Sequence, residues 1–328
     1  MAASDLAMVH GGGLIAARAM FPLAPEPWID LSTGINPLPY PVPALAPEAY
    51  QRLPEPEEVL RLEAAAARAY GVADPRTVVA APGTQILISL LPHLLRPGCV
   101  AVVGPTYAEH AAAWAAAGST VSVVPGVASV GSGPAAVLCN PNNPDGCRTR
   151  VADLLALAAR VGVLVVDEAF ADLEGPGLSL APVLPANAVV LRSFGKTYGL
   201  AGLRLGFAVA SLPMARVIRT ALGPWAVSGA AVAFGTAALS DAAWLHATCT
   251  RLQADALRLD DMLTQAGFQV LGGTLLFRLA RYAEATAVFN RLGRSGILVR
   301  RFDAEPGWLR FGIPGDGWDR LVAALPAA

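Results

Sequence analysis

The fold is decided by Ser193-Phe194-Gly195-Lys196-Thr197-Tyr198-Gly199-Leu200-Ala201-Gly202-Leu203-Arg204-Leu205-Gly206. This stretch follows the uninterrupted apolar run 188–191 and leads into a second one, 205–210, so a polar loop joins two segments of strand length. In an open α/β sheet, ligands bind in the loops that follow the carboxyl ends of strands. The loop therefore predicts a functional site that contains the amine of Lys196.

Outward from this loop, short apolar runs alternate with segments of helical periodicity. Such alternation predicts an α/β protein with a mostly parallel sheet covered on both faces. The other strand candidates are 77–81, 99–103, 121–124, 135–139 and 163–166, and the helix candidates between them are 57–70, 85–95, 108–117 and 151–161.

The two ends of the chain differ from this middle part in composition and periodicity. The first fifty residues are rich in Pro and Gly and read as an ordered arm, whereas 230–265 is nearly all helix-forming and is followed by shorter apolar runs. We predict a smaller α+β domain there. The expected division is an arm, 1–36, that joins the small domain, a large domain, 37–228, and a small domain, 229–328.

Composition excludes several classes of protein. The chain has 328 residues, 54% hydrophobic and 15% charged, with 24 Lys and Arg against 25 Asp and Glu. This balance gives no electrostatic footprint for nucleic acid. The longest apolar stretch, 86–95, contains Pro92 and His93, and it is shorter than the roughly 20 residues that a membrane-spanning helix needs.

The thiols indicate neither a metal site nor a disulfide framework. The four cysteines, Cys99, Cys139, Cys147 and Cys249, are scattered without metal-ligand spacing. The N-terminus has no basic segment followed by an apolar run. We therefore expect free thiols in a reduced cytoplasm and no bound metal.

Four polar loops follow predicted strands, and each has an ordinary structural explanation when taken alone. Residues 140–146 (Asn-Pro-Asn-Asn-Pro-Asp-Gly) form a turn, Asp167 caps a helix, Gly83-Thr84 begins a helix, and a lysine after a strand is commonly solvated. Together they put a lysine, an acid, an amide, hydroxyls and a helix N-terminus along one sheet edge. A lysine imine, an acid facing a ring nitrogen and an anion cradle suit pyridoxal 5′-phosphate. No Gly-x-Gly-x-x-Gly fingerprint competes.

The lysine segment 193–206 resembles that of the fold-type-I pyridoxal phosphate enzymes, and within them the class I/II aminotransferases, especially the histidinol-phosphate aminotransferase branch. Segments 140–146 and 166–170 are similar to other signatures of that superfamily, in the same order. The resemblance implies the PLP-dependent transferase fold type I: a large domain with a mainly parallel seven-stranded sheet, plus a small α+β domain. It also implies a homodimer.

The arm is similar to that of the threonine-phosphate decarboxylases of cobalamin biosynthesis, at 10–13 (His-Gly-Gly-Gly), 30–38 and 52–57. This resemblance implies a lyase that decarboxylates L-threonine O-3-phosphate to (R)-1-aminopropan-2-yl phosphate. Transamination of histidinol phosphate or a related amino acid is the alternative. A non-catalytic sensor or scaffold with this fold is a third possibility, against which the full set of lysine, aspartate and asparagine argues.

The resemblance assigns roles to cofactor-binding residues. Lys196 forms the imine with the cofactor and later moves protons, and Asp167 pairs with the pyridinium nitrogen. Asn143 donates to the phenolic oxygen of the ring, and Tyr107 stacks on its face. The cofactor phosphate is assigned to Ser193, Arg204, Gly83, Thr84 and Gln85.

On the substrate side, Arg310 matches the arginine that grips an anionic group, and Arg300 lies upstream. Two arginines in one pocket suit a substrate that carries both a carboxylate and a phosphate. Asn36 and Gly34 are expected in the same pocket, and His10 is expected to cover the substrate phosphate.

Two positions depart from the pattern of the superfamily. Phe170 stands three residues after the aspartate, where a tyrosine often donates to the ring oxygen. Without that donor, we expect the imine proton to be held more tightly than in a Phe170→Tyr variant. Leu53 stands where relatives often carry a tyrosine that reaches the cofactor phosphate of the partner subunit, so that intersubunit contact is not expected here.

Overall fold

The computed structural model describes residues 11–175 and 177–326. They group into two compact units, a large one comprising 39–247 and a small one comprising 11–38 with 248–326. The chain passes between the two units after residue 38 and again after residue 247. The second of these boundaries falls inside one long helix, α10 (Ala242–Gln265). Each unit has its own sheet.

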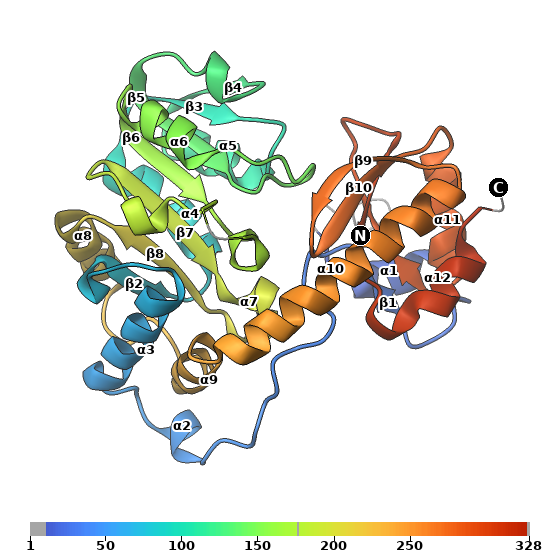
Figure 1. The fold of residues 1–328 in the computed structure, drawn as a ribbon, viewed down its shortest axis with the longest axis horizontal. Helices are drawn as coiled ribbons and strands as arrows, with labels where there is room; N and C mark the ends of the chain where they lie inside the picture. The colour runs from blue at the N-terminus through green and yellow to red at the C-terminus, as the bar shows by residue number, and fades with distance from the viewer. Residues whose placement is uncertain (1–10, 176, 327–328) are drawn as a thin grey trace. The chain divides into compact units, whose positions relative to one another are not determined.

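The large unit is built on a seven-stranded sheet with strand order β2-β8-β7-β6-β5-β3-β4 (Figure 1). Strands β3 to β7 run parallel to one another, whereas β8 is antiparallel to its two neighbours, β2 and β7. The predicted mainly parallel seven-stranded sheet is thus confirmed. The strands are β2 (Val78–Ala81), β3 (Cys99–Val103), β4 (Thr120–Val124), β5 (Gly133–Cys139), β6 (Val161–Asp167), β7 (Ala188–Ser193) and β8 (Gly206–Ala210).

Continuous apolar strands form here because both faces of the sheet are covered. Successive side chains of a strand point to opposite faces, and those of the large sheet divide between two separate cores. Leu164 and Val166 of β6 belong to one core, whereas Val165 belongs to the other. On β7, Val190 joins the first core and Leu191 the second.

Different helices close the two cores. The first contains side chains from α3 (Pro56–Ala69), α6 (Val151–Ala158) and α9 (Gly229–Leu239), and the second contains side chains from α4 (Thr84–Leu95), α5 (Ala108–Ala116) and α8 (Leu212–Leu222). Two very short helices, α2 (Glu48–Gln51) and α7 (Phe194–Thr197), complete the large unit.

Helix α9 belongs to the large unit, although the sequence pattern assigned 229–247 to the small domain. The reason is packing, since Ala231 and Val232 are buried in the first core of the large sheet. At Gly235, an added Cβ would lie 2.8 Å from Cδ1 of Leu62 on α3. A glycine in α9 thus lets the two helices approach closely.

The small unit has the α+β character that the sequence predicts. Its main sheet is antiparallel, in the order β12-β13-β10-β9, and a second sheet pairs β1 with β11 in parallel (Figure 1). The strands are β1 (Ile29–Asp30), β9 (Gln269–Thr274), β10 (Phe277–Arg281), β11 (Ile297–Leu298), β12 (Arg300–Arg301) and β13 (Trp308–Gly312). The helices other than α10 are α1 (Leu14–Met20), α11 (Ala285–Arg294) and α12 (Trp318–Ala324).

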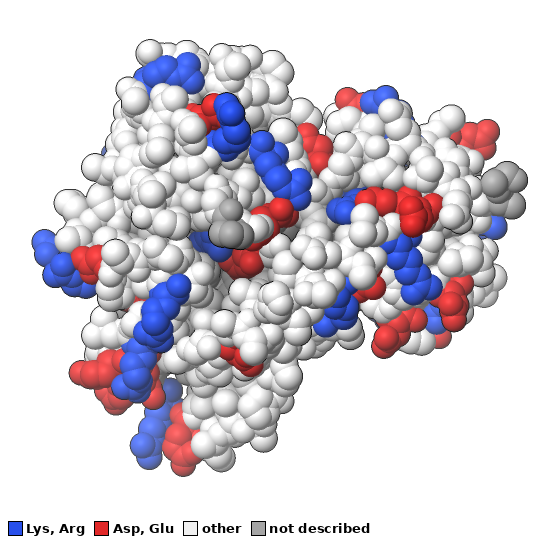
Figure 2. Space-filling view, viewed as in Figure 1, with Lys and Arg blue, Asp and Glu red and all other residues white. Residues whose placement is uncertain are grey.

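The arm is part of the small unit because it pairs with the C-terminal strands. The backbone N–H of Leu31 donates to the carbonyl of Leu298, and that of Gly312 donates to the carbonyl of Leu31. Among the described residues, no helix has the length and apolarity to cross a membrane. On the face that Figure 2 shows, basic and acidic residues are interspersed among large uncharged areas.

The two leucines at 154 and 155 on α6 test the importance of the first core. Leu154 is fully buried, whereas Leu155 is 39% exposed. Leu154→Ala is expected to lower the free energy of unfolding by about 2–5 kcal/mol because it leaves a cavity. Urea unfolding should show a clearly smaller loss for Leu155→Ala, and equal losses would contradict this account of the core.

Candidate active site

Strand direction brings four polar loops to one edge of the large sheet. The parallel strands β5, β6 and β7 end there at Cys139, Asp167 and Ser193. Strand β8 begins at the same edge, where Gly206 pairs with Ser193 on one side and with Ala81, the last residue of β2, on the other. The loops that follow β2, β5, β6 and β7 therefore meet, as the sequence predicts.

Two glycines allow a close approach between the loop after β2 and the lysine loop. A Cβ on Gly206 would lie 2.8 Å from the backbone nitrogen of Thr84. A Cβ on Gly83 would lie 2.6 Å from Nη2 of Arg204, and Gly83 has a φ of 85°. The guanidinium of Arg204 thus lies directly against the residue before α4.

This arrangement is suited to an anion. Helix α4 begins at Thr84, and its N-cap residue, Gly83, has no side chain that could cap the first turn. Free N–H groups and the helix dipole favour negative charge at such an end, and the Arg204 guanidinium adds a positive charge beside it. Ser193, at the end of β7, is joined to the same loops through Gly206. The structure therefore brings together Ser193, Gly83, Thr84 and Arg204.

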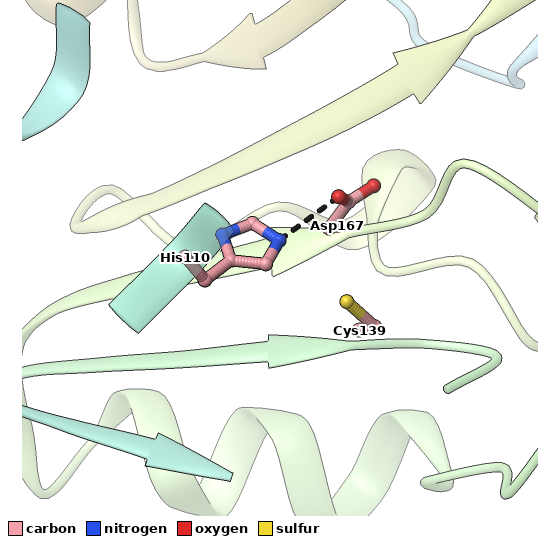
Figure 3. Close-up of side chains that lie close together, drawn as sticks. All are labelled: His110, Cys139 and Asp167. Carbon is pink, nitrogen blue, oxygen red and sulfur yellow. Dashed lines mark hydrogen bonds and ion pairs between the residues drawn. The ribbon is translucent and has the colours of Figure 1, made fainter. Parts of the chain in front are cut away.

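Asp167 is buried and hydrogen-bonded at both carboxylate oxygens. Oδ1 accepts from the backbone N–H of Ala169 at 3.0 Å, and Oδ2 lies 3.0 Å from Nε2 of His110 (Figure 3). His110 comes from α5, on the same side of the sheet as Asp167, and its side chain is 2% exposed. A carboxylate held in this way is fixed in position before any ligand binds.

Cys139, the last residue of β5, lies next to this pair. Its sulfur, a ring nitrogen of His110 and a carboxylate oxygen of Asp167 form a buried cluster in which these atoms lie within 4.8 Å of one another (Figure 3). Burial disfavours a charged imidazole, but Cys139 and the Asp167 carboxylate outweigh it and raise the pKa of His110 to about 10. At neutral pH the imidazolium therefore donates to Asp167 and supports its negative charge.

Tyr107 and Gln85 extend the polar chain that starts at Asp167. The ring of Tyr107 lies edge-on to His110, with 6.1 Å between centroids, and its hydroxyl donates to Oε1 of Gln85 at 3.1 Å. Gln85 is in the first turn of α4. The predicted aromatic residue is thus linked both to the predicted anion-binding turn and to the predicted acid.

The turn that contains Asn143 is fixed by its other amides. Asn140 is fully buried, where its side chain accepts from the backbone N–H of Thr149 and donates to the carbonyl of Thr149. Nδ2 of Asn142 donates to the carbonyl of Pro105, two residues before Tyr107. Asn143 therefore lies in a turn that is anchored to its own segment at Thr149 and to the loop that contains Pro105.

Lys196 lies in the one-turn helix α7, and its Nζ is 5.2 Å from the centre of the Phe170 ring. Phe170 is buried and follows Asp167 by three residues. The lysine loop and the aspartate loop are thus in contact at this ring. A Cβ on Gly195 would lie 2.7 Å from Cα of Ala201, so glycine is needed where the lysine turn folds back on the loop.

The predicted substrate residues that the structure describes lie in the small unit. Arg300 on β12 pairs directly with Arg310 on β13, so the two side chains emerge on the same face. Burial and the charge of Arg300 lower the pKa of Arg310 to about 10, against the opposing effect of Asp30. Nη2 of Arg310 donates to the carbonyl of Ser32 in the arm at 2.7 Å.

The other predicted substrate residues belong to the same arm. Oδ1 of Asn36 accepts from Nη2 of Arg251 at 3.1 Å, and Gly34 is buried two residues earlier. His10 lies outside the described residues. Within the small unit, the arm therefore runs beside a pair of arginines that repel each other, which is a suitable arrangement for an anionic ligand.

Comparison with known proteins identifies the family. The model of the class I and II aminotransferases matches residues 26–325. The chain belongs to this family. It is 43% identical to the threonine-phosphate decarboxylase of a Sinorhizobium species, over 97% of each chain, and 40% identical to that of Pseudomonas aeruginosa, over 96% of each chain. The resemblance found in the lysine segment is thus confirmed.

Solved structures of the family have the same fold. Histidinol-phosphate aminotransferase from Sinorhizobium meliloti, solved in complex with pyridoxal 5′-phosphate, superimposes with a TM-score of 0.85 at 22% identity, covering 98% of this chain and 95% of the other. The fold-type-I architecture is confirmed by this likeness.

Sequence reasoning missed His110 as a partner of Asp167. The available signal was spacing, because His110 follows Tyr107 by three residues, so the two side chains lie on the same side of the first turn of α5.

The His110–Asp167 pair predicts a specific pH dependence. Because folding raises the pKa of His110 from about 6.5 to about 10, its contribution to stability is complete below pH 6.5 and is lost as the pH rises toward 10. The slope is about 1.4 kcal/mol per pH unit. His110→Gln should remove this slope between pH 7 and 9 in urea unfolding, and parallel pH profiles of the two proteins would exclude a charged His110.

Proposed function

We propose that this chain is a pyridoxal 5′-phosphate-dependent lyase that decarboxylates L-threonine O-3-phosphate to (R)-1-aminopropan-2-yl phosphate. The observation that carries the proposal is the identity of 43% and 40% to two threonine-phosphate decarboxylases over nearly their whole length. The resemblance of the arm to such decarboxylases points the same way.

The residues of the large unit fit the cofactor. Gly83 and Gly206 leave room where a Cβ would collide with Arg204 or with the first turn of α4, so a phosphate can approach backbone N–H groups and a guanidinium together. Asp167 offers a fixed anionic carboxylate. When bound, pyridoxal 5′-phosphate takes up the electron pair that remains on a substrate α-carbon after one of its bonds breaks.

The protein's own contribution to this chemistry begins at Asp167. Its carboxylate, supported by His110, keeps a proton on the ring nitrogen of the cofactor. Asn143 donates to the phenolic oxygen of the ring, and Tyr107 covers a ring face. Ser193, Arg204 and the turn Gly83-Thr84-Gln85 bind the phosphate.

Lys196 is the catalytic residue. Its Nζ would hold pyridoxal 5′-phosphate by a covalent bond and would be available as a free amine once the substrate is bound. After loss of the carboxylate as carbon dioxide, Nζ would deliver a proton to the α-carbon that carried it. Contact with the Phe170 ring keeps the lysine turn beside the aspartate loop.

The arginines of the small unit bind the substrate in this proposal. Arg310 and Arg300 take its two anionic groups, and Asn36 and Gly34 of the arm contact it as well. A substrate with both a carboxylate and a phosphate suits this pair of arginines. The way in which these residues hold the carboxylate would select loss of carbon dioxide over loss of the α-hydrogen.

We further propose a cytoplasmic homodimer that acts in cobalamin biosynthesis. Four large apolar residues between 42 and 60 are more than half exposed: Val42, Tyr50, Leu53 and Leu60. Such a group on one short segment supports a contact with a second copy of the chain. Leu53 would contribute apolar contact area there, without a hydroxyl for a partner's cofactor.

The decisive assay is incubation of the purified protein with L-threonine O-3-phosphate and pyridoxal 5′-phosphate. We expect carbon dioxide release without formation of a keto acid, and its loss in Lys196→Ala. Histidinol phosphate with 2-oxoglutarate should give no glutamate. Glutamate formation without carbon dioxide release would instead establish the aminotransferase alternative, and a protein that binds no cofactor would revive the non-catalytic one.

Gly83→Ala tests the phosphate cradle, with Gly98→Ala as its matched control. Both glycines have positive φ, so each alanine carries a backbone penalty of about 1–2 kcal/mol. Only the Cβ at position 83 meets Arg204, because nothing lies within 4 Å of the corresponding Cβ at position 98.

Absorbance titration of the cofactor-free protein should show cofactor affinity at least about tenfold weaker for Gly83→Ala, because a hydrogen bond to a charged group is lost. Gly98→Ala should bind as the wild type does. An equal effect of the two substitutions would mean that the Gly83 turn does not hold the phosphate.

A further inference from the structure

A buried network lies on the face of the large sheet opposite to Asp167. Along β6, Val163 and Val165 pack in one core and Leu164 and Val166 in the other. Because side chains alternate, Asp167 belongs with the first of these pairs and Glu168 with the second. The backbone N–H of Glu168 still bonds to the carbonyl of Leu191 on β7 at 2.8 Å, so the alternation persists to this residue.

Arg192 reaches this opposite face from β7, where it follows Leu191 and precedes Ser193. Its Nη1 donates to Oε2 of Glu168 at 2.8 Å, and its Nη2 donates to Oδ1 of Asp172. The guanidinium also lies 4.4 Å from the centre of the Tyr70 ring. The side chains of Arg192, Glu168 and Asp172 are all 6% exposed or less.

Glu168 is the centre of this network. Besides Arg192, it accepts from the hydroxyl of Ser179 at 2.5 Å and from the backbone N–H of Leu180 at 2.7 Å. Burial raises the pKa of Glu168, although its donors oppose that rise. Losing one partner of a fully buried pair leaves an uncompensated charge, which is strongly unfavourable.

We propose that Arg192 is a positioning residue of the cofactor site, which clamps the segment 168–172 against the end of β7 and thereby sets Asp167 and Phe170 relative to Lys196. This inference rests on the proposed cofactor chemistry. It follows from the order of the residues along the chain. Asp167 directly precedes Glu168, and Phe170 lies between the two residues whose carboxylates Arg192 binds. Lys196 follows Arg192 by four residues.

Because one guanidinium binds two carboxylates, the clamp depends on the shape of the cationic side chain at position 192. Arginine presents a planar fork that can bind Glu168 and Asp172 at once, whereas lysine is a compact point charge. Arg192→Lys keeps the charge but cannot keep both contacts. The Asp167–Lys196 spacing should then relax while the sheet itself remains.

A second arginine–glutamate pair in the same unit provides the matched control. Nη2 of Arg219 lies 3.0 Å from Oε2 of the buried Glu63 and also donates to the carbonyl of Val78. Val78 is the first residue of β2, at the opposite end of that strand from Ala81 and the candidate site. The Arg219 side chain is 41% exposed, so this pair is less buried than that of Arg192. Arg219→Lys therefore weakens an arginine–glutamate pair of the same unit without touching the loops that contain Asp167 and Lys196.

The experiment uses holoenzyme loaded with pyridoxal 5′-phosphate and measures the pH midpoint of its visible absorption and the dissociation constant of the cofactor. For Arg192→Lys we expect the midpoint to shift by about 0.5–1 pH unit and the cofactor to bind about tenfold more weakly. Arg219→Lys should change neither quantity, even if it lowers the melting temperature as much as Arg192→Lys does.

An unchanged midpoint and affinity in Arg192→Lys would overturn the proposal, as would equal changes in the two lysine variants. Should Arg192→Lys not fold, Asp172→Asn removes one arm of the clamp at constant size and should shift the midpoint in the same direction. No shift there would also overturn it.

Both measurements are independent of substrate turnover. A wild-type protein that binds the cofactor but releases no carbon dioxide refutes the proposed function and leaves the inference about Arg192 standing. A wild-type protein that binds no cofactor refutes both.

Discussion

The ladder between β6 and β7 is the constraint on which the candidate site depends. It places Asp167 opposite Leu191 and extends by one further hydrogen bond to Glu168. Because the two strands are parallel, the acid at the end of one and the lysine turn after the other meet at the same edge. Strand direction alone brings Asp167 and the lysine turn close together. The His110 hydrogen bond and the Phe170 contact then fix their positions more closely.

The same strand ends serve two purposes on two faces. Asp167 and His110 lie on the side closed by α5, while Glu168 and Arg192 lie on the side closed by α3. Alternation of side chains lets neighbouring residues do different work without competing for space. The loops of the candidate site, on the face of Asp167, are therefore held in part by polar contacts on the opposite face. Substitutions of Glu168 or Arg192 can thus act on the site through the sheet.

The linear signals in the sequence account for most of the large unit. Uninterrupted apolar runs predicted its strands, and the loops after them contain the lysine, the acid and the glycines that the structure brings together. What sequence alone did not indicate depends on faces and packing. His110 joins Asp167 only because α5 lies on the proper side of the sheet, and α9 joins the large unit because Gly235 fits against Leu62. The opposition of Arg300 and Arg310 depends on the register of two short strands, which no local pattern reveals.

The opposed arginines have a consequence for selectivity. Two like charges that face each other across a ladder repel each other, and an anion that lies between them relieves that repulsion. A ligand with two separated negative groups can pair with both guanidiniums, whereas an ordinary amino acid, with its single carboxylate, can pair with one. Amino acids with a single carboxylate would thus be weak competitors for the substrate. The discrimination against them would come from the repulsion between the two arginines rather than from a steric barrier.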